Sequence, residues 1–425
     1  MNESYYTEDQ MEKDNILSID VITKYKTAAD IANFVMKKVV HSTYAGQSIS
    51  EICKLGDSLI TEQVSNIFKK RGIEKGIAFP TCLNLNNIAQ NYSPLSHSVH
   101  QILTANDVVK IELGVHVDGY IATLAHTVVV SEKDIEATSP LLDVFLGRAA
   151  DAICAAYYGL EIASRMIKPG NKSVDVKNAI RKVAAAFKCQ PCNDTDSRLM
   201  KRYILESDKH IPNVSFSKDF NPSSQYDASS HELIRSDMDY EEETFDDFEF
   251  KTNEVYSVNI VISSGSGQLR ESLDEEFGIL QRDVNQKYNL KLKSSKICLE
   301  TAMKHFSVFP FSTRGLLDID ERLKLGLPEC ISHNLLCPLP VKEEGANKHS
   351  TIAQFKCTLL LMPNGKVERI TAGEEMFGLP YVHSDFNVES SGMAEILKLN
   401  LKNVGEKLGL MLPSTSGDAM AMTID

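Results

Sequence analysis

The chain contains 425 residues, of which 43% are hydrophobic, and its formal net charge is −13. This length and apolar content allow one large domain or two to three small ones, whereas the acidic charge excludes a protein that coats nucleic acid indiscriminately. No apolar run approaches the roughly 18 residues of a transmembrane helix, and the acidic N-terminus is unlike a signal peptide. We therefore expect no membrane partner. Nine cysteines lack the spacing of a disulfide framework, so we expect reduced thiols and a location in the cytosol or nucleus.

The first quarter of the chain predicts a tail, two helices and a strand. Residues 1–17 are polar and acidic, and we expect a disordered tail there. Apolar residues at helical spacing predict a helix over 25–41. Ser48-Ile49-Ser50-Glu51 has the pattern of a capping box, and the helix that it opens should continue to about Arg71 and end at Gly72. Residues 76–91 are strand-like.

Residues 108–130 predict a β-hairpin around which the chain is organised. Apolar residues alternate with others along both arms. Asp118-Gly119 between the arms is a strong signal for a two-residue turn, because both central positions need positive φ. This turn pairs Glu112 with Ala125, and Thr123 then lies diagonally across from Glu112 on the same face, roughly 7–8 Å away.

The remaining segments complete an α+β pattern. We expect helices over 141–167, 173–187 and 294–305, and strands over 255–262, 353–362 and 367–370. Residues 386–425 predict a C-terminal helix over 393–412 followed by a disordered tail. Helices, then paired strands, then helices again are typical of the α+β class.

An acidic insertion at about residues 207–250 interrupts this pattern. Residues 237–249 contain eight acids and no base. Such a run is typical of a solvated, mobile loop, because it cannot bury enough apolar surface to order itself. The alternative interpretation is a docking site for a basic partner.

The stretch 76–130 resembles the methionine aminopeptidase, or pita-bread, family, and most of all its type 2 branch. The family has an acidic residue in a KIDxG pattern, where this chain has Glu112 in KIELG, and a second acid eleven residues later, where it has Thr123. The resemblance covers roughly residues 20–385. It implies one pita-bread domain over 18–385, with two pseudo-related halves around a curved antiparallel sheet, flanking helices and the acidic insertion.

The resemblance also implies a degenerate metal site. The enzymes bind two divalent metals through two aspartates, a histidine and two glutamates, and place a further histidine against the substrate. The five ligand positions fall on Glu112, Thr123, Arg198, Asn259 and Lys356, and the substrate-facing histidine position falls on Asn91. Divalent cations need anionic oxygen or neutral imidazole ligands, and only one carboxylate remains.

We therefore expect no catalytic residue, no metal, no cofactor and no enzymatic activity. We also expect Lys356, with Arg198, to pair with Glu112 and fill the space of the metals. The alternative is that the two cations turn to solvent. A metal-dependent methionine aminopeptidase remains an alternative only if unaligned residues rebuild the metal site, and a protein or peptide scaffold that works without RNA is a third possibility.

Within the family, the chain is most similar to the proliferation-associated, ErbB-receptor-binding proteins, which are non-peptidase relatives. The shared stretches include KGIAFPT at 75–81, LGVHVDG at 113–119, AQFK at 353–356 and LLMPNG at 360–365. The resemblance implies binding to structured RNA and the large ribosomal subunit, contacts with regulatory proteins, and roles in ribosome assembly, translation and cell growth. It further implies a cytoplasmic, nuclear and nucleolar location, and we expect a monomer.

Two departures from this branch concern the C-terminal region. The branch often ends in a lysine-rich tail, whereas residues 413–425 contain no lysine, and Asn400 interrupts its LxxLL-type motif.

Two basic clusters are candidates for contact with RNA phosphates. They consist of Lys69, Lys70, Arg71 and Lys75, and of Arg282, Lys287, Lys291, Lys293 and Lys296 with Tyr288 interleaved. The alternative interpretation of each is a solvated helix end or strand edge. His116 and His126 on the hairpin arms, and the CxxC at 189–192, are interpreted as structural.

Overall fold

The computed structural model describes ten segments of the chain. They are residues 18–69, 72–95, 101–132, 145–214, 226–227, 232–233, 246–272, 278–345, 350–373 and 381–403. The predicted tails at 1–17 and 413–425, residues 404–412 of the predicted C-terminal helix, and most of the acidic insertion lie outside the described residues.

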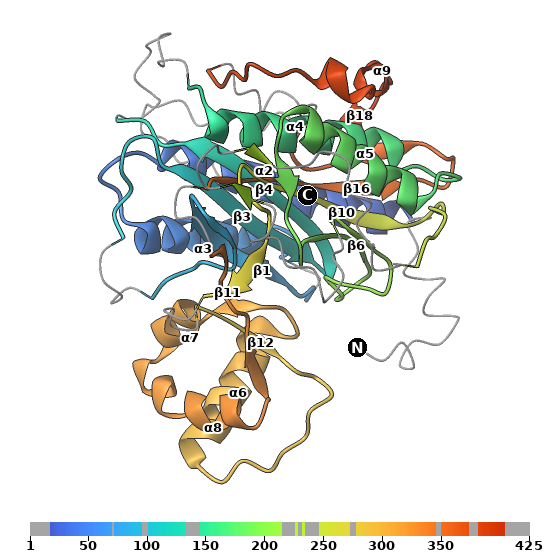
Figure 1. The fold of residues 1–425 in the computed structure, drawn as a ribbon. Coiled ribbons are helices and arrows are strands. Elements are labelled where there is room, and N and C mark those ends of the chain that lie inside the picture. The colour runs from blue at the N-terminus through green and yellow to red at the C-terminus, as the bar shows by residue number, and fades with distance from the viewer. Residues whose placement is uncertain are drawn as a thin grey trace, which may run out of the picture.

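A ten-stranded, mostly antiparallel sheet forms the centre of the molecule (Figure 1). Its main path runs β1 (Lys75–Leu85), β3 (Val108–Val117), β4 (Tyr120–Val129), β16 (Ile352–Leu361), β10 (Val255–Ser263), β6 (Asp196–Met200) and β7 (His210–Pro212). Beside this path, β5 (Gln190–Pro191) pairs with β10, β17 (Val367–Arg369) pairs with β16, and β18 (Lys402–Asn403) pairs in parallel with β17.

The central hairpin has the predicted register. Glu112 lies opposite Ala125, and Gly114 lies opposite Thr123. The turn residues Asp118 and Gly119 have φ values of 57° and 78°, as a two-residue hairpin turn requires. The prediction from the Asp-Gly pair is therefore confirmed.

Four helices cover one face of the sheet (Figure 1). Helices α2 (Ile19–His41) and α3 (Ile49–Asn66) pack on the β1–β4 half, and α4 (Arg148–Met166) packs on β10 and β16, with α5 (Ser173–Ala186) beside it. Strands β3, β4 and β10 are buried along almost their whole length. The sheet thus has two halves: α2 and α3 cover β1, β3 and β4, and α4 covers β10 and β16.

Three predicted helix boundaries are wrong. The Ser48 side chain contacts Ser50 Oγ at 3.0 Å and caps no backbone amide, so no capping box forms, and α3 ends at Asn66 instead of near Arg71. The helix expected from residue 141 begins at Arg148, because Gly147 has φ of 89°. The helix expected over 25–41 starts earlier, at Ile19.

The prediction of a C-terminal helix over 393–412 is also wrong for the residues that the structure describes. Helix α9 spans only Ala394–Leu397, and residues 402–403 form β18 instead. Arg369 Nε donates to Asn403 Oδ1 at 2.7 Å, and Lys402 pairs with Glu368. Tertiary hydrogen bonds with β17 thus override helical periodicity in this segment.

The structure shows ordered residues at both ends of the predicted acidic insertion at about 207–250. Strand β7 extends the sheet to Pro212, and Phe250 is buried and packs edge-on against Tyr256. The hairpin β8 (Tyr226–Asp227) with β9 (Glu232–Leu233) lies between these ends.

A second lobe with its own apolar core lies below the sheet in Figure 1. It contains β12 (Ile279–Arg282), α6 (Lys293–Phe306), β13 (Phe311–Ser312), α7 (Thr313–Ile319), a 3-10 turn (Glu321–Leu325), α8 (Leu327–Ser332) and β14 (Leu336–Pro338). A buried ion pair anchors it to the main body, since Arg314 Nη2 lies 2.8 Å from Asp57 Oδ2 on α3. A small sheet of β11 (Leu269–Glu271), β15 (Lys342–Glu344) and β2 (Ile88–Gln90) adjoins this connection.

Candidate functional site

A cavity of about 560 Å³ lies between the central sheet and the lobe. The lobe and its connection contribute mainly apolar side chains, and the sheet contributes polar ones. All six positions that the family resemblance singled out line this one cavity: Asn91, Glu112, Thr123, Arg198, Asn259 and Lys356. The fold therefore brings together residues that are up to 265 positions apart in the sequence.

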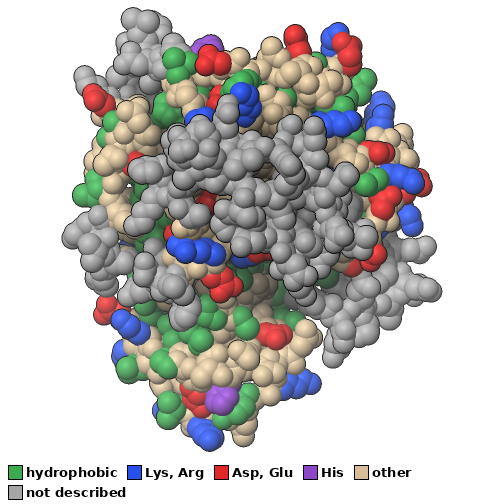
Figure 2. Space-filling model, in the orientation of Figure 1, with side chains coloured by type: hydrophobic (Ala, Val, Ile, Leu, Met, Phe, Trp, Pro, Cys, Tyr) green, Lys and Arg blue, Asp and Glu red, His purple; other side chains and the backbone are tan. Residues whose placement is uncertain are grey.

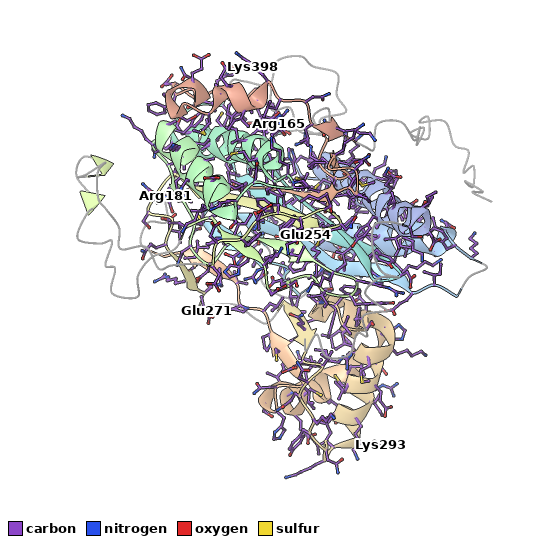
Figure 3. All side chains as sticks on the ribbon, turned by 90° about the vertical axis from the view of Figure 1, so that its right-hand side faces the viewer. Arg165, Arg181, Glu254, Glu271, Lys293 and Lys398 are labelled. Carbon is purple, nitrogen blue, oxygen red and sulfur yellow. The ribbon has the colours of Figure 1, made fainter. Side chains whose placement is uncertain are left out.

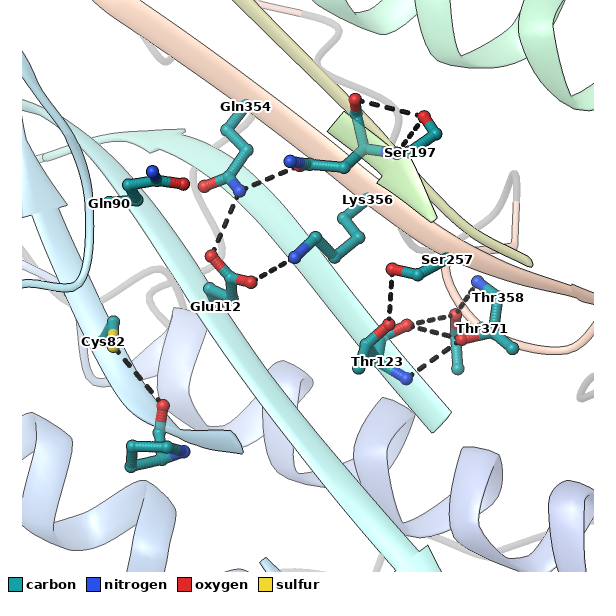
Figure 4. Close-up of polar contacts among 12 residues, drawn as sticks. Cys82, Gln90, Glu112, Thr123, Ser197, Ser257, Gln354, Lys356, Thr358 and Thr371 are labelled. Carbon is teal, nitrogen blue, oxygen red and sulfur yellow. Dashed lines mark hydrogen bonds and ion pairs between the residues drawn. The ribbon is translucent and has the colours of Figure 1, made fainter. Parts of the chain in front are cut away.

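An ion pair occupies the floor of the cavity (Figure 4). Lys356 Nζ on β16 contacts Glu112 Oε1 on β3, and the two side chains are 14% and 6% exposed. Gln354 Nε2 donates to Glu112 Oε2 at 3.1 Å and to Asn259 Oδ1 at 2.9 Å. The predicted pairing of Lys356 with Glu112 is confirmed, and the carboxylate has both a charged and a neutral donor.

Arg198 does not join this pair, so the expectation that it would contact Glu112 is wrong. Its Nη2 lies 2.6 Å from Asp196 Oδ2, and its Nε lies 3.6 Å from Glu206 Oε2. Asp196 stands two positions earlier on β6 and hence on the same face of the strand. The guanidinium is neutralised at the rim of the cavity.

Hydroxyl and amide groups fill the remaining ligand positions. Thr123 Oγ1 lies 2.9 Å from Ser257 Oγ. The Asn259 backbone N–H donates to Ser197 Oγ at 2.9 Å. Each of these groups is buried and hydrogen-bonded. Among the described residues Gln354 Oε1 has no hydrogen-bond partner, so the floor is a polar network with one unsatisfied acceptor.

The same region joins the two halves of the sheet through side chains. Strands β4 and β16 share a single backbone pair, Lys356 with Ala125. Threonine hydroxyls make the other links: Thr358 Oγ1 accepts from the Thr123 N–H and donates to the Thr123 carbonyl, both at 2.9 Å, and Thr127 Oγ1 donates to the Gln354 carbonyl at 2.6 Å. We call this junction of β4 and β16 the seam.

The donor set does not fit a pair of divalent metals. Its one carboxylate is bonded to an ammonium group, and the other positions offer a hydroxyl, an amide and two cationic side chains. An ammonium about 4 Å from a dication would repel it by about 8 kcal/mol at an effective dielectric of about 20. Among the residues that the structure describes, no three His, Cys, Asp or Glu side chains form a group able to hold a metal ion.

Asn91 and the hairpin histidines have structural contacts. Asn91 adopts φ of 69°, and its Nδ2 donates to the Pro340 carbonyl at 2.9 Å. Burial lowers the pKa values of His116 and His126 to about 3. The His116 ring packs on Phe309, with 4.3 Å between the ring centroids. Both imidazoles are therefore neutral packed rings at physiological pH.

The CxxC cysteines are buried free thiols. Burial raises the pKa of Cys189 to about 12 and that of Cys192 well above its usual value. Both remain protonated at neutral pH.

The structure describes only Lys69 and Lys75 of the first basic cluster. Lys69 is exposed, but Lys70 and Arg71 lie outside the described residues. The Lys75 ammonium donates to the Ile67 carbonyl, and burial together with the charge of Lys69 lowers its pKa.

The second basic cluster lies on the lobe. Lys287, Lys291, Lys293 and Lys296 are exposed, and the structure shows no ion pair between them and any described residue. Figure 3 shows Lys293 at the far end of the lobe from the sheet. Arg282 differs, because it is half-buried and its Nε donates to the Ser307 carbonyl at 3.2 Å. Burial also lowers its pKa.

Comparison with known proteins identifies the class. Residues 23–213 match the profile of metallopeptidase family M24. The structure is similar to that of a thermophilic Arx1 (TM-score 0.74, 25% identity, 91% of this chain and all of the other). It also shares its fold with a methionine aminopeptidase from Thermotoga maritima (TM-score 0.50, 16% identity, 84% and 99%). The fold is therefore the pita-bread fold of the M24 metallopeptidases, which confirms the α+β class and the fold expected from the family resemblance.

Sequence relatives narrow the class. ErbB-3 binding protein 1 of Solanum tuberosum is 36% identical over 84% of this chain and 83% of its own length. Proliferation-associated protein A of Dictyostelium discoideum is 36% identical over 90% and 89%. A Schizosaccharomyces pombe relative, 32% identical over 94% and 95%, is named curved DNA-binding protein. The chain belongs to the family of proliferation-associated and ErbB-3-binding proteins, which confirms the membership expected from its motifs.

Proposed function

We propose that this protein is a non-catalytic member of its family that binds structured RNA and the large ribosomal subunit. In this role it regulates ribosome assembly, translation and cell growth, as a monomer that also contacts regulatory proteins. Its sites of action are the cytoplasm, the nucleus and the nucleolus. None of the described helices is long and apolar enough to cross a membrane.

The observation that carries the proposal is the charge of the lobe. Residues 278–341 contain nine Lys and Arg against six Asp and Glu, a net charge of +3 in a chain whose total is −13. On the face in Figure 2, Lys and Arg side chains lie around the outer rim of the lobe. RNA phosphates require exposed, unneutralised cations, and the four lysines of the second basic cluster supply them.

The cavity supports the absence of hydrolysis. Metallopeptidase chemistry needs a metal-activated water and a Lewis acid. Here the Lys356 ammonium pairs with the one remaining carboxylate at the ligand positions. A peptidase would require a second donor set, whereas Asp194, Asp196 and Glu206 on the cavity walls already pair with Lys342 or Arg198.

Co-sedimentation with purified large ribosomal subunits across a salt titration tests the proposal. Binding should weaken steeply with salt, because phosphate contacts release counterions. The double variant Lys291→Glu/Lys293→Glu should bind more weakly and lower the slope of log K against log salt by about 2. The matched control, Lys182→Glu/Lys366→Glu, makes the same charge change at exposed sites outside the lobe and should bind like the wild type.

A peptide scaffold is the second candidate function, favoured by the apolar wall of the cavity, which includes Phe79, Phe309 and Leu339. It predicts that peptides bind in the cavity while ribosomal subunits do not, even at low salt. That result would overturn the RNA proposal. Hydrolysis of a methionyl peptide in the presence of Co²⁺ or Mn²⁺ would overturn the non-catalytic assignment instead.

A further inference from the structure

Two aromatic rings are stacked on the lobe beside the second basic cluster. The rings of Tyr288 and His333 lie with centroids 3.6 Å apart and an interplanar angle of 15°. Tyr288 packs against the core of the lobe, and both side chains remain partly exposed. The pair joins the loop before α6 to the residue that follows α8.

Hydrogen bonds hold this ring pair in place. Gln286 Nε2 donates to the His333 carbonyl at 3.1 Å, and the His333 N–H donates to the Glu329 carbonyl at 3.2 Å. The Glu329 carboxylate accepts from the backbone N–H groups of Lys291 and Leu292 at 2.7 and 3.1 Å. The rings and the start of the lysine-bearing segment are thus fixed to one another before any ligand arrives.

Exposed lysines and the Glu329 carboxylate both lie near the rings. Lys287 precedes Tyr288 directly in the chain, and Lys291 begins the segment that Glu329 holds beside His333. The Glu329 carboxylate is occupied by backbone donors. A ligand over the rings therefore meets an aromatic surface flanked by exposed ammonium groups.

We propose that the Tyr288–His333 pair stacks an unpaired RNA base while the neighbouring lysines contact the flanking phosphates. The inference rests on the proposed RNA-binding function and adds a preference for unpaired RNA. Lysines alone contact phosphates in paired and unpaired strands alike. A base can stack on a protein ring only where it is free of its own duplex, and such stacking adds affinity for any base.

The test measures fluorescence anisotropy of the full-length protein with a single-stranded 12-nucleotide RNA and with the 12-base-pair duplex of the same sequence. His333→Ala should weaken single-strand binding about tenfold, the effect of removing one stacked base, and change duplex binding less than twofold. His333→Phe should keep single-strand affinity within about twofold, because it retains a ring. His305→Ala makes the same change at an exposed histidine elsewhere on the lobe and should change neither.

The outcomes separate this inference from the function on which it rests. Suppose that Lys291→Glu/Lys293→Glu weakens binding of both RNAs. If His333→Ala then leaves single-strand binding unchanged, or weakens single-strand and duplex binding equally, the stacking site is wrong and RNA binding stands. If the wild type binds neither RNA, the proposed function fails with it. If His333→Phe loses as much single-strand affinity as His333→Ala, stacking is also overturned, because an aromatic ring at this position would then not be enough for binding.

Discussion

The Glu112–Lys356 pair should be strongly coupled in a double-mutant cycle. At about 3 Å and an effective dielectric of about 20, the attraction between the two charges is about 5 kcal/mol before desolvation is subtracted. Lys356→Met leaves a Glu112 carboxylate that is 6% exposed, with one neutral donor from Gln354. Removing one partner of such a buried pair lowers the free energy of unfolding by about 3 kcal/mol.

The complementary change should be milder. Glu112→Gln leaves an ammonium that lines the cavity and is 14% exposed, so it can reach water, and the loss should be about 1 kcal/mol. The double variant has no unpaired charge and should lose only about 1 to 2 kcal/mol. The coupling energy between the two sites is then about 2 to 3 kcal/mol.

Guanidinium denaturation of the four proteins at pH 7 measures this coupling. The exposed pair Lys398–Glu395, whose side chains are 71% and 81% exposed, is the matched control and should couple by less than about 0.5 kcal/mol. A coupling at Glu112–Lys356 no larger than that of the control would refute the reasoning, because the pair would then be solvated like a surface pair.

Three further predictions follow from the fold. Gly119→Ala should cost at least about 2 kcal/mol more than Gly46→Ala, because both have positive φ but only the first would bring a Cβ within 2.5 Å of the Tyr203 ring; equal losses in denaturation would contradict this. His116 and His126 have folded pKa values of about 3, below the ordinary 6.5. As the pH falls below 6.5, these histidines are protonated in the unfolded chain but not in the folded protein. The free energy of unfolding is therefore highest above pH 6.5 and decreases as the pH drops. Each histidine should contribute about 1 kcal/mol of loss between pH 6 and 5, and His126→Leu should flatten the measured slope by that amount. EDTA should leave the thermal midpoint unchanged, and a fall on chelation would show that a metal supports the fold.

The sequence was most informative where local rules and burial agree. The Asp-Gly turn fixes the register of the hairpin, and that register places Glu112 and Thr123 on one face. Alternation along β16 also contained a signal that was missed: Gln354 stands two residues before Lys356 and therefore points to the same side. The structure shows it bonded to Glu112 and Asn259.

Elsewhere tertiary contacts decided the outcome. The lobe was not anticipated as a unit, because α7 and α8 have seven and six residues and give too little periodicity to detect. Arg198 was expected at Glu112 on charge alone, yet Asp196 on its own strand is nearer. The ends of α3 and α4 depend on cap geometry, and the pairing of residues 402–403 with β17 is a long-range contact that no local pattern indicates.

The seam has a consequence for how the chain is made. Thr123 and Thr358 are 235 residues apart, so at about 5–20 residues per second a ribosome would take roughly 10 to 50 s to deliver the second after the first. During that interval β4 is the open border of a half-built sheet. An open strand border exposes backbone groups that invite pairing with other chains. At the seam β4 presents the Thr123 N–H and carbonyl and the Thr127 hydroxyl, and water can bond to these groups until β16 arrives. The hydrogen bonds of the seam therefore form late, after β16 has been synthesised, and β4 remains hydrated until then.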